Sequence, residues 1–448
     1  MAAPPRVRLP ALLQGAAFAI DTIGFLERCR DRHGDVFEVR LPGMGRFVYV
    51  VDPALIKQVF AADRDIGLAG AARRPFFEPL LGTQSLLTTD GEQWERQRKL
   101  LGPPFHGELI ENYRQQIHDI AAAEVDGWPR GMPMPLRPRM QAITLEVILR
   151  LVFGIDDADR LDRLRSLLPK LGDQGAWLFW LQPHSRFMWL PPMKAVFRTR
   201  DQVDAILFDE IAKRRADPTV ADRKDILSLL IAQSDADDQE LRDELLTLLA
   251  AGHETTATAL AWAFERLARH PHVVERIRAE QDGEEYLDAV VKETLRVRPV
   301  IMDVIRKLKE PMQLGRWEIP VDRHPTPGIA VVQRDGAIHE DRLAFRPERF
   351  IGNPGTFAGW IPFGGGRRRC VGSHMALLEM KVVIKAVLER VELEAPNARD
   401  ERARLHHITL VPMRGALLTV RPRADAPVRL PARRGGDELA EPVAVAGD

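Results

Sequence analysis

The chain contains 448 residues, and its 64 acidic side chains balance its 64 basic ones, so the formal net charge is zero. This balance favours neither nucleic acid nor an anionic membrane as a partner. The only cysteines, Cys29 and Cys370, are too few for a disulfide framework, which indicates a reducing compartment.

The N-terminal apolar run is short, and Gln14 and Gly15 interrupt it. A membrane-spanning helix needs about 20 mostly apolar residues. We therefore expect a cytoplasmic protein without a membrane anchor, and we set residues 1–20 apart as an N-terminal extension. A weak signal peptide, with Arg6 and Arg8 before the apolar run, is the alternative.

The next segments alternate helical and β signals. "GFLERCRDRHG" predicts a helix that ends at Gly34 and leaves Cys29 as a spectator thiol. "DVFEVRLPG" and "RFVYVVDP" alternate apolar and polar residues and predict a hairpin. From Asp90 to Val297 apolar residues recur at three- and four-residue spacing, which predicts helices almost throughout.

The longest helical run, residues 239–270, is apolar on more than one face, so we expect it to cross the centre of the protein. After Pro299 short β-like pieces and turns extend to Cys370, and "MALLEMKVVIKAVLER" predicts a second strong helix. We predict a mostly α fold with a minor β portion in one domain, residues 21–424, and a disordered tail, residues 425–448.

The stretch "FGGGRRRC" places the scarce thiol of Cys370 just before a helix N-terminus. Free N–H groups, the helix dipole and three arginines should lower the pKa of this thiol. A nucleophile would need a His base nearby, and a zinc site would need more Cys or His ligands. A haem needs one protein ligand and cations for its two propionates, so a haem-thiolate fits best.

The extended loop "FGGGRRRCVG" resembles the haem-ligand loop of the cytochrome P-450 monooxygenases, matching at Phe363, Gly366, Arg368, Cys370 and Gly372. Further motifs follow the same family's order: "WERQR" with Trp94 and Arg98, "AGHETT" from Ala251, "ETLR" with Glu293 and Arg296, and "FRPERF" with Arg349. Gln333 and Gly336 depart from the family's usual residues in a structural stretch.

The resemblance implies a single-domain cytochrome P-450 fold that holds haem b between the long central helix and the cysteine-loop helix. It makes Cys370 the metal ligand and implies that Thr255 and Glu254 are catalytic, in oxygen activation and proton delivery. The cofactor contacts that it implies are Cys370, Trp94, Arg98, Ala251, Arg306, Phe363 and Arg368. The Glu293, Arg296 and Arg349 trio is assigned to structure.

By the same resemblance the protein inserts one oxygen atom from O2 into a lipophilic molecule of the terpenoid, steroid, fatty-acid or polyketide class. We expect electrons to come from NAD(P)H through a separate ferredoxin with its reductase or a flavodoxin-type donor, and we expect a monomer. The alternatives are a peroxide-driven or isomerising haem-thiolate enzyme and a non-catalytic haem sensor. Two apolar stretches resemble substrate lids: residues 175–192, and "LAGAARRPFFEPLLG" with Phe76 and Phe77.

Overall fold

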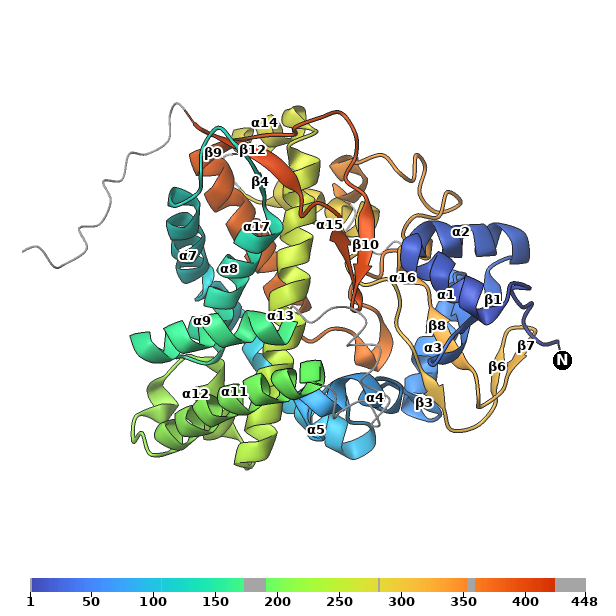
Figure 1. Ribbon diagram of the computed structural model, residues 1–448, viewed down its shortest axis with the longest axis horizontal. Helices are drawn as coiled ribbons and strands as arrows, with labels where there is room; N and C mark the ends of the chain where they lie inside the picture. Colours follow the sequence, from blue (N-terminus) through green and yellow to red (C-terminus); the bar gives the residue numbers. More distant parts are fainter. Residues whose placement is uncertain (1, 106, 173–190, 281–282, 353–358, 424–448) are drawn as a thin grey trace, which may run out of the picture.

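The computed structural model describes residues 2–105, 107–172, 191–280, 283–352 and 359–423. The tail expected to be disordered, and nearly all of the lid expected at residues 175–192, lie outside these residues. The expected mostly α fold with a minor β portion is confirmed (Figure 1). No helix in the described ranges is long and apolar enough to cross a bilayer.

The helices form most of the molecule around one central helix. Their bounds are α1 Ala11–Ile20, α2 Thr22–His33, α3 Pro53–Ala61, α4 Ala69–Leu81, α5 Gly91–Leu101, α6 Glu108–Glu111, α7 Arg114–Asp126, α8 Arg137–Val147, α9 Ala158–Gly172, α11 Pro191–Arg215, α12 Ile226–Gln233, α13 Asp238–Leu267, α14 Pro271–Ala279, α15 Glu285–Val297, α16 Ile329–Val332 and α17 Ser373–Arg390.

Helix α13 is the predicted central helix, and it runs unbroken for 30 residues. Asp237 caps its N-terminus by accepting a hydrogen bond from the N–H of Glu240 at 2.7 Å. Helices α8, α11, α15 and α17 pack around it, which explains why its sequence is apolar on several faces (Figure 1).

The β portion is assembled mainly from short strands. The bounds are β1 Val36–Leu41, β2 Gly45–Val50, β3 Gly67–Leu68, β4 Pro133–Pro135, β5 Lys307–Leu308, β6 Met312–Leu314, β7 Trp317–Ile319, β8 His324–Pro327, β9 Val391–Glu394, β10 Ala403–His406, β11 Thr409–Pro412 and β12 Leu417–Pro422. The predicted hairpin is confirmed, since β1 and β2 pair antiparallel from Val36↔Val50 to Leu41↔Gly45. Strand β8 joins β2 in parallel and completes a sheet of order β1-β2-β8.

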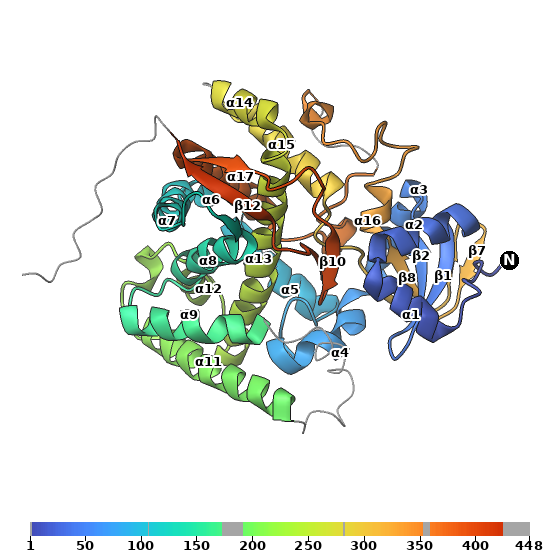
Figure 2. The same ribbon diagram turned by 45° about the horizontal axis from the view of Figure 1, so that its top comes forward.

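This sheet and helices α1 and α2 lie beside the helical mass, as the turned view shows (Figure 2). Helix α2 ends at Gly34, whose φ of 84° permits the turn into β1. The buried thiol of Cys29 belongs to the apolar core of this part, and burial raises its pKa to about 11. Helix α1, which we had set apart as an extension, packs on α2 and β1.

Candidate active site

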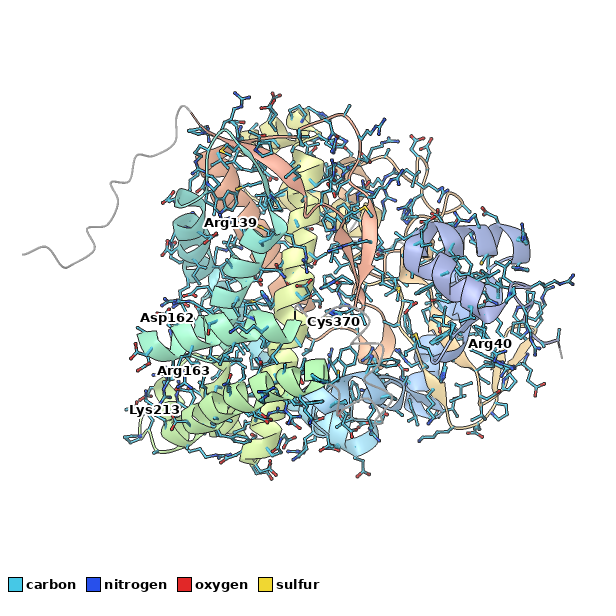
Figure 3. All side chains as sticks on the ribbon, in the orientation of Figure 1. Arg40, Arg139, Asp162, Arg163, Lys213 and Cys370 are labelled. Carbon is cyan, nitrogen blue, oxygen red and sulfur yellow. The ribbon has the colours of Figure 1, made fainter. Side chains whose placement is uncertain are left out.

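The cysteine loop turns sharply between a short 3-10 helix, Gly366–Arg368, and the start of α17 at Ser373. The N–H of Cys370 donates to the carbonyl of Phe363 at 3.0 Å and closes the turn. Gly366 has a φ of 63°, and a Cβ there would lie 2.9 Å from the carbonyl oxygen of Phe60. Glycine is therefore required, and the loop presents Cys370 toward α13 (Figure 3).

Cys370 is accessible because it lines a cavity, and surrounding protein encloses its thiol there. Burial raises its pKa, and the opposing effects of the Gly372 N–H and of Arg98, Arg369 and Arg73 do not outweigh burial. The expectation that the loop lowers the pKa of this thiol is therefore wrong. A coordinating metal would deprotonate the thiol outright, so this raised pKa is compatible with a thiolate ligand.

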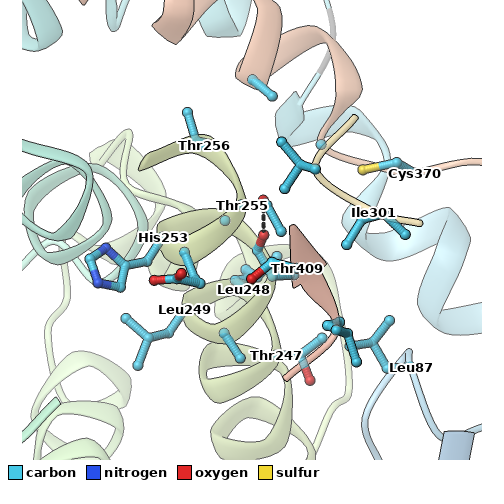
Figure 4. Close-up of a pocket in the computed structure, with 18 of the residues that line it drawn as sticks. Leu87, Thr247, Leu248, Leu249, His253, Thr255, Thr256, Ile301, Cys370 and Thr409 are labelled. Atoms are coloured by element: carbon cyan, nitrogen blue, oxygen red, sulfur yellow. Dashed lines mark hydrogen bonds between the residues drawn. The ribbon is translucent and has the colours of Figure 1, made fainter. Parts of the chain in front are cut away.

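One cavity of about 1520 Å³ extends between α13, the cysteine loop and the segment after α15 (Figure 4). Its walls are mainly apolar, and Phe76 and Phe77 of α4 line it, as the sequence suggested. Ile301 and Leu248 also lie in its wall, and Cys370 lies near Ile301. The cavity therefore has room for a large planar group and a lipophilic ligand together.

Three arginines in the cavity wall lack a full set of partners. Arg368 donates to the carbonyl of Thr89 at 2.9 Å and to Asp90, but its Nη1 is buried with no partner in the part of the chain that the structure describes. Arg98 and Arg73 form no hydrogen bond or ion pair within the described ranges.

The charges of these arginines are not neutralised by protein groups alone. Burial, together with repulsion from Arg306 and Arg368, lowers the pKa of Arg73 to about 9. Burial likewise lowers the pKa of Arg368 to about 10, against the opposing effect of Asp90. A half-buried cluster of cations with unused N–H groups favours an anion, and two propionates meet this need. The residues present therefore fit a haem.

The other predicted cofactor residues also line the cavity. The indole of Trp94 lies 4.1 Å beneath the guanidinium of Arg368, and Phe363 packs edge-on against Trp360 at 6.2 Å. Arg306 is buried and makes an ion pair with Asp63, so its guanidinium is already partly neutralised. The binding of a haem propionate by Arg306, which the resemblance implies, stays a prediction.

On α13 the small residues Ala251 and Gly252 form part of the cavity wall. The Thr255 hydroxyl donates to the carbonyl of Ala251 at 2.5 Å, as the four-residue spacing predicted (Figure 4). His253 points away from Cys370 and meets the Thr144 hydroxyl at 2.8 Å. No cluster of three His, Cys, Asp or Glu side chains suited to a metal occurs in the ranges given above.

Glu254 is held by two side chains of α8, neither of which the sequence singled out. Arg137 donates to its Oε1, and Gln141 Nε2 donates to its Oε2 at 2.8 Å. Burial would raise the pKa of Glu254, but Arg137 and Gln141 more than offset it, so the pKa lies below its usual value. Glu254 is therefore an ionised carboxylate on the side of α13 that faces α8.

The predicted structural trio is confirmed as a set of contacts. Arg296 donates to Glu293 through Nε at 2.7 Å and Nη2 at 2.8 Å, and Arg349 Nε donates to Glu293 at 3.3 Å. Gln333, a departure from the family pattern, donates its amide to the carbonyl of Leu295 at 3.0 Å. Arg296 also donates through Nη1 to the carbonyls of Gln333 and Arg342, so further polar groups satisfy the buried pair, as a buried ion pair needs.

Comparisons with known proteins agree with this geometry. The family described as Cytochrome P450 matches residues 4–419. The putative cytochrome P450 135B1 of Mycobacterium tuberculosis is 39% identical to this chain, and the match covers 97% of each protein. The putative cytochrome P450 138 of the same species is also 39% identical, and the match covers 94% of this chain and 96% of the other.

Solved structures share the fold. The retinoic acid-bound cyanobacterial CYP120A1 superposes with a TM-score of 0.80 at 24% identity, covering 94% of this chain and all of the other. The haem domain of cytochrome P450DA superposes with a TM-score of 0.82 at 22% identity, covering 94% of this chain and 98% of the other. The chain therefore belongs to the cytochrome P450 family.

Proposed function

We propose that the protein is a haem-thiolate monooxygenase that hydroxylates or epoxidises a lipophilic molecule with O2. The observation that carries the proposal is the meeting of Cys370, Thr255 and the under-partnered arginines in the wall of one apolar cavity. A haem bound through Cys370 supplies the oxygen activation, and the protein supplies binding, orientation and protons.

The residues of this chain have separate parts in the proposal. Arg368, Arg98 and Arg73 hold the two propionates and so fix the plane of the macrocycle. The Thr255 hydroxyl, which now donates to Ala251, can turn to hydrogen-bond a ligand in the cavity. Glu254 stands one residue before Thr255 and, as an ionised carboxylate, can pass protons inward from the α8 side.

Electrons are proposed to come from NAD(P)H through a separate iron–sulfur or flavin protein. Arg369 is exposed in the cysteine loop and Lys99 is exposed on α5, and neither has an ion pair in the described ranges. Arg96 on α5 and Arg367 in the cysteine loop are paired, Arg96 with Glu240 and Arg367 with Glu95. Lys99 and Arg369 are therefore the better contacts for an acidic donor.

The test is the absorption spectrum of the purified, reduced protein under carbon monoxide. We expect the band position that is typical of thiolate ligation, and its loss in Cys370→Ser. A spectrum typical of imidazole ligation in the wild type would refute the proposal. Product formation that needs both O2 and NAD(P)H separates a monooxygenase from a peroxide-driven or isomerising enzyme and from a haem sensor.

A further inference from the structure

The segment from Ile301 to Arg306 brings one acidic side chain, that of Asp303, into the cavity wall. The segment is fixed beside the sheet, because the N–H of Val304 donates to the carbonyl of Pro327 at 3.3 Å and that of Arg306 to Pro325 at 3.1 Å. Ile301, at its other end, faces the cavity near Cys370 (Figure 4). Asp303 is therefore held by main-chain bonds on the wall of the cavity itself.

Asp303 is oriented by a hydrogen bond from Tyr49. The Tyr49 hydroxyl donates to its Oδ2 at 2.7 Å, and the Tyr49 ring is buried in β2 and stacks on Phe37 at 5.7 Å. The second oxygen, Oδ1, has no hydrogen-bond partner in the described ranges, and it is not among the buried atoms that lack one. One carboxylate oxygen is thus fixed, and the other is presented to the cavity.

This carboxylate has no basic partner in the part of the chain that the structure describes, although other acidic side chains of the cavity wall do, such as Glu254 and Glu146. Burial raises the pKa of Asp303 to about 6, against the lowering effect of Tyr49, the titratable side chain that faces it. Asp303 is then mostly ionised at neutral pH. Keeping an unpaired carboxylate in a mainly apolar wall costs desolvation free energy, and a cation carried by a ligand would offset that cost.

A second carboxylate of the same wall, Glu379, is a poor alternative. It is only 4% exposed, and its Oε1 is buried with no hydrogen-bond partner among the described residues. A ligand in the cavity therefore cannot reach that oxygen in this structure. The apolar residues beside Asp303 and Tyr49 along their own segments, Met302, Val304 and Phe47, also line the cavity and suit a hydrocarbon skeleton.

We propose that Asp303, positioned by Tyr49, binds the protonated amine of a lipophilic substrate. The proposal rests on the function proposed above and specifies the substrate class: a largely hydrocarbon molecule with one basic nitrogen. That nitrogen would be held at the sheet end of the cavity, so that the apolar remainder extends toward the Cys370 side.

The test uses the haem-loaded full chain and three probes with one alkyl chain: N,N-dimethyldodecylamine, 1-dodecanol and dodecanoate. A tertiary amine is chosen because its crowded nitrogen is a poor iron ligand. Affinities are measured by calorimetry and by the shift of the haem absorption band. In Asp303→Asn we expect amine binding to weaken at least about tenfold, because the partner charge is removed, while dodecanol changes less than about threefold.

Two further variants make the result specific. In Tyr49→Phe the charge of Asp303 remains and only the orienting hydrogen bond is lost, so we expect the affinity for the amine to fall by about twofold to fivefold. Glu379→Gln removes another cavity-wall carboxyl that has no basic partner among the described residues, and we expect it to leave the ratio of amine to dodecanol affinity unchanged. Equal losses for amine and dodecanol in Asp303→Asn, or loss of amine selectivity in Glu379→Gln instead, would overturn the proposal.

The same measurements separate this inference from the proposed function. If the carbon monoxide spectrum lacks the thiolate band, the monooxygenase proposal fails, yet calorimetry still reports whether Asp303 selects the amine. If the spectrum is as expected and Asp303→Asn binds all three probes like the wild type, only the amine site is refuted.

Discussion

The buried carboxyl of Glu379 should make the stability of this protein depend on pH. Glu379 lies on α17, is 4% exposed, and has no partner for its Oε1 in the described ranges. Burial alone raises its pKa from 4.5 to about 8. In the folded protein this side chain therefore keeps its proton at neutral pH, whereas in the unfolded chain it is ionised.

The sign of the effect follows from proton binding. Between pH 4.5 and about 8 the folded state holds one more proton than the unfolded state, so the free energy of unfolding falls as the pH rises. The slope is about 1.4 kcal/mol per pH unit for one proton. Glutamine does not titrate. From about pH 5 to about pH 7.5 the Glu379→Gln variant should therefore gain about 3 kcal/mol relative to the wild type.

The assay is urea unfolding of the haem-loaded wild type and variant at several pH values, followed by far-ultraviolet circular dichroism. The quantity of interest is how the difference in unfolding free energy between variant and wild type changes with pH. A packing cost of the substitution does not vary with pH and so does not affect this change. Glu275→Gln, at an exposed position of α14, is the control and should show a difference that is flat with pH. A flat difference for Glu379→Gln as well would show that this carboxyl is ionised in the folded state and would refute the reasoning.

Three further predictions concern the site. Thr255→Ala should leave ligand binding intact but lower the product formed per O2 consumed by about tenfold or more, measured together with peroxide release. Arg137→Gln removes the cation that holds the pKa of Glu254 low, so the acid limb of the pH profile of kcat should move to higher pH. Arg73→Gln should speed haem transfer to apomyoglobin by about tenfold, since one propionate loses a charged partner; an unchanged transfer rate would remove Arg73 from the haem site.

The sequence by itself determined the family and the main elements, and it predicted Cys370 as the ligand of the haem iron. In "FGGGRRRC" the glycines allow the chain to turn, and the cysteine stands just before the next helix. Both features depend only on neighbouring residues, so the sequence shows them directly. The hairpin, the central helix and the bond from Thr255 to Ala251 follow from periods of two and of about four residues, which neighbouring residues express directly.

Only the tertiary structure decided which distant groups face one another. The sequence suggested a low pKa for Cys370, but burial outweighs the arginines, and burial depends on everything packed around the loop. Arg137 on Glu254, Asp63 on Arg306 and Tyr49 on Asp303 join segments that are far apart in the chain. Such pairs carry no local periodicity or spacing, because desolvation and Coulomb interactions act through space and not along the sequence.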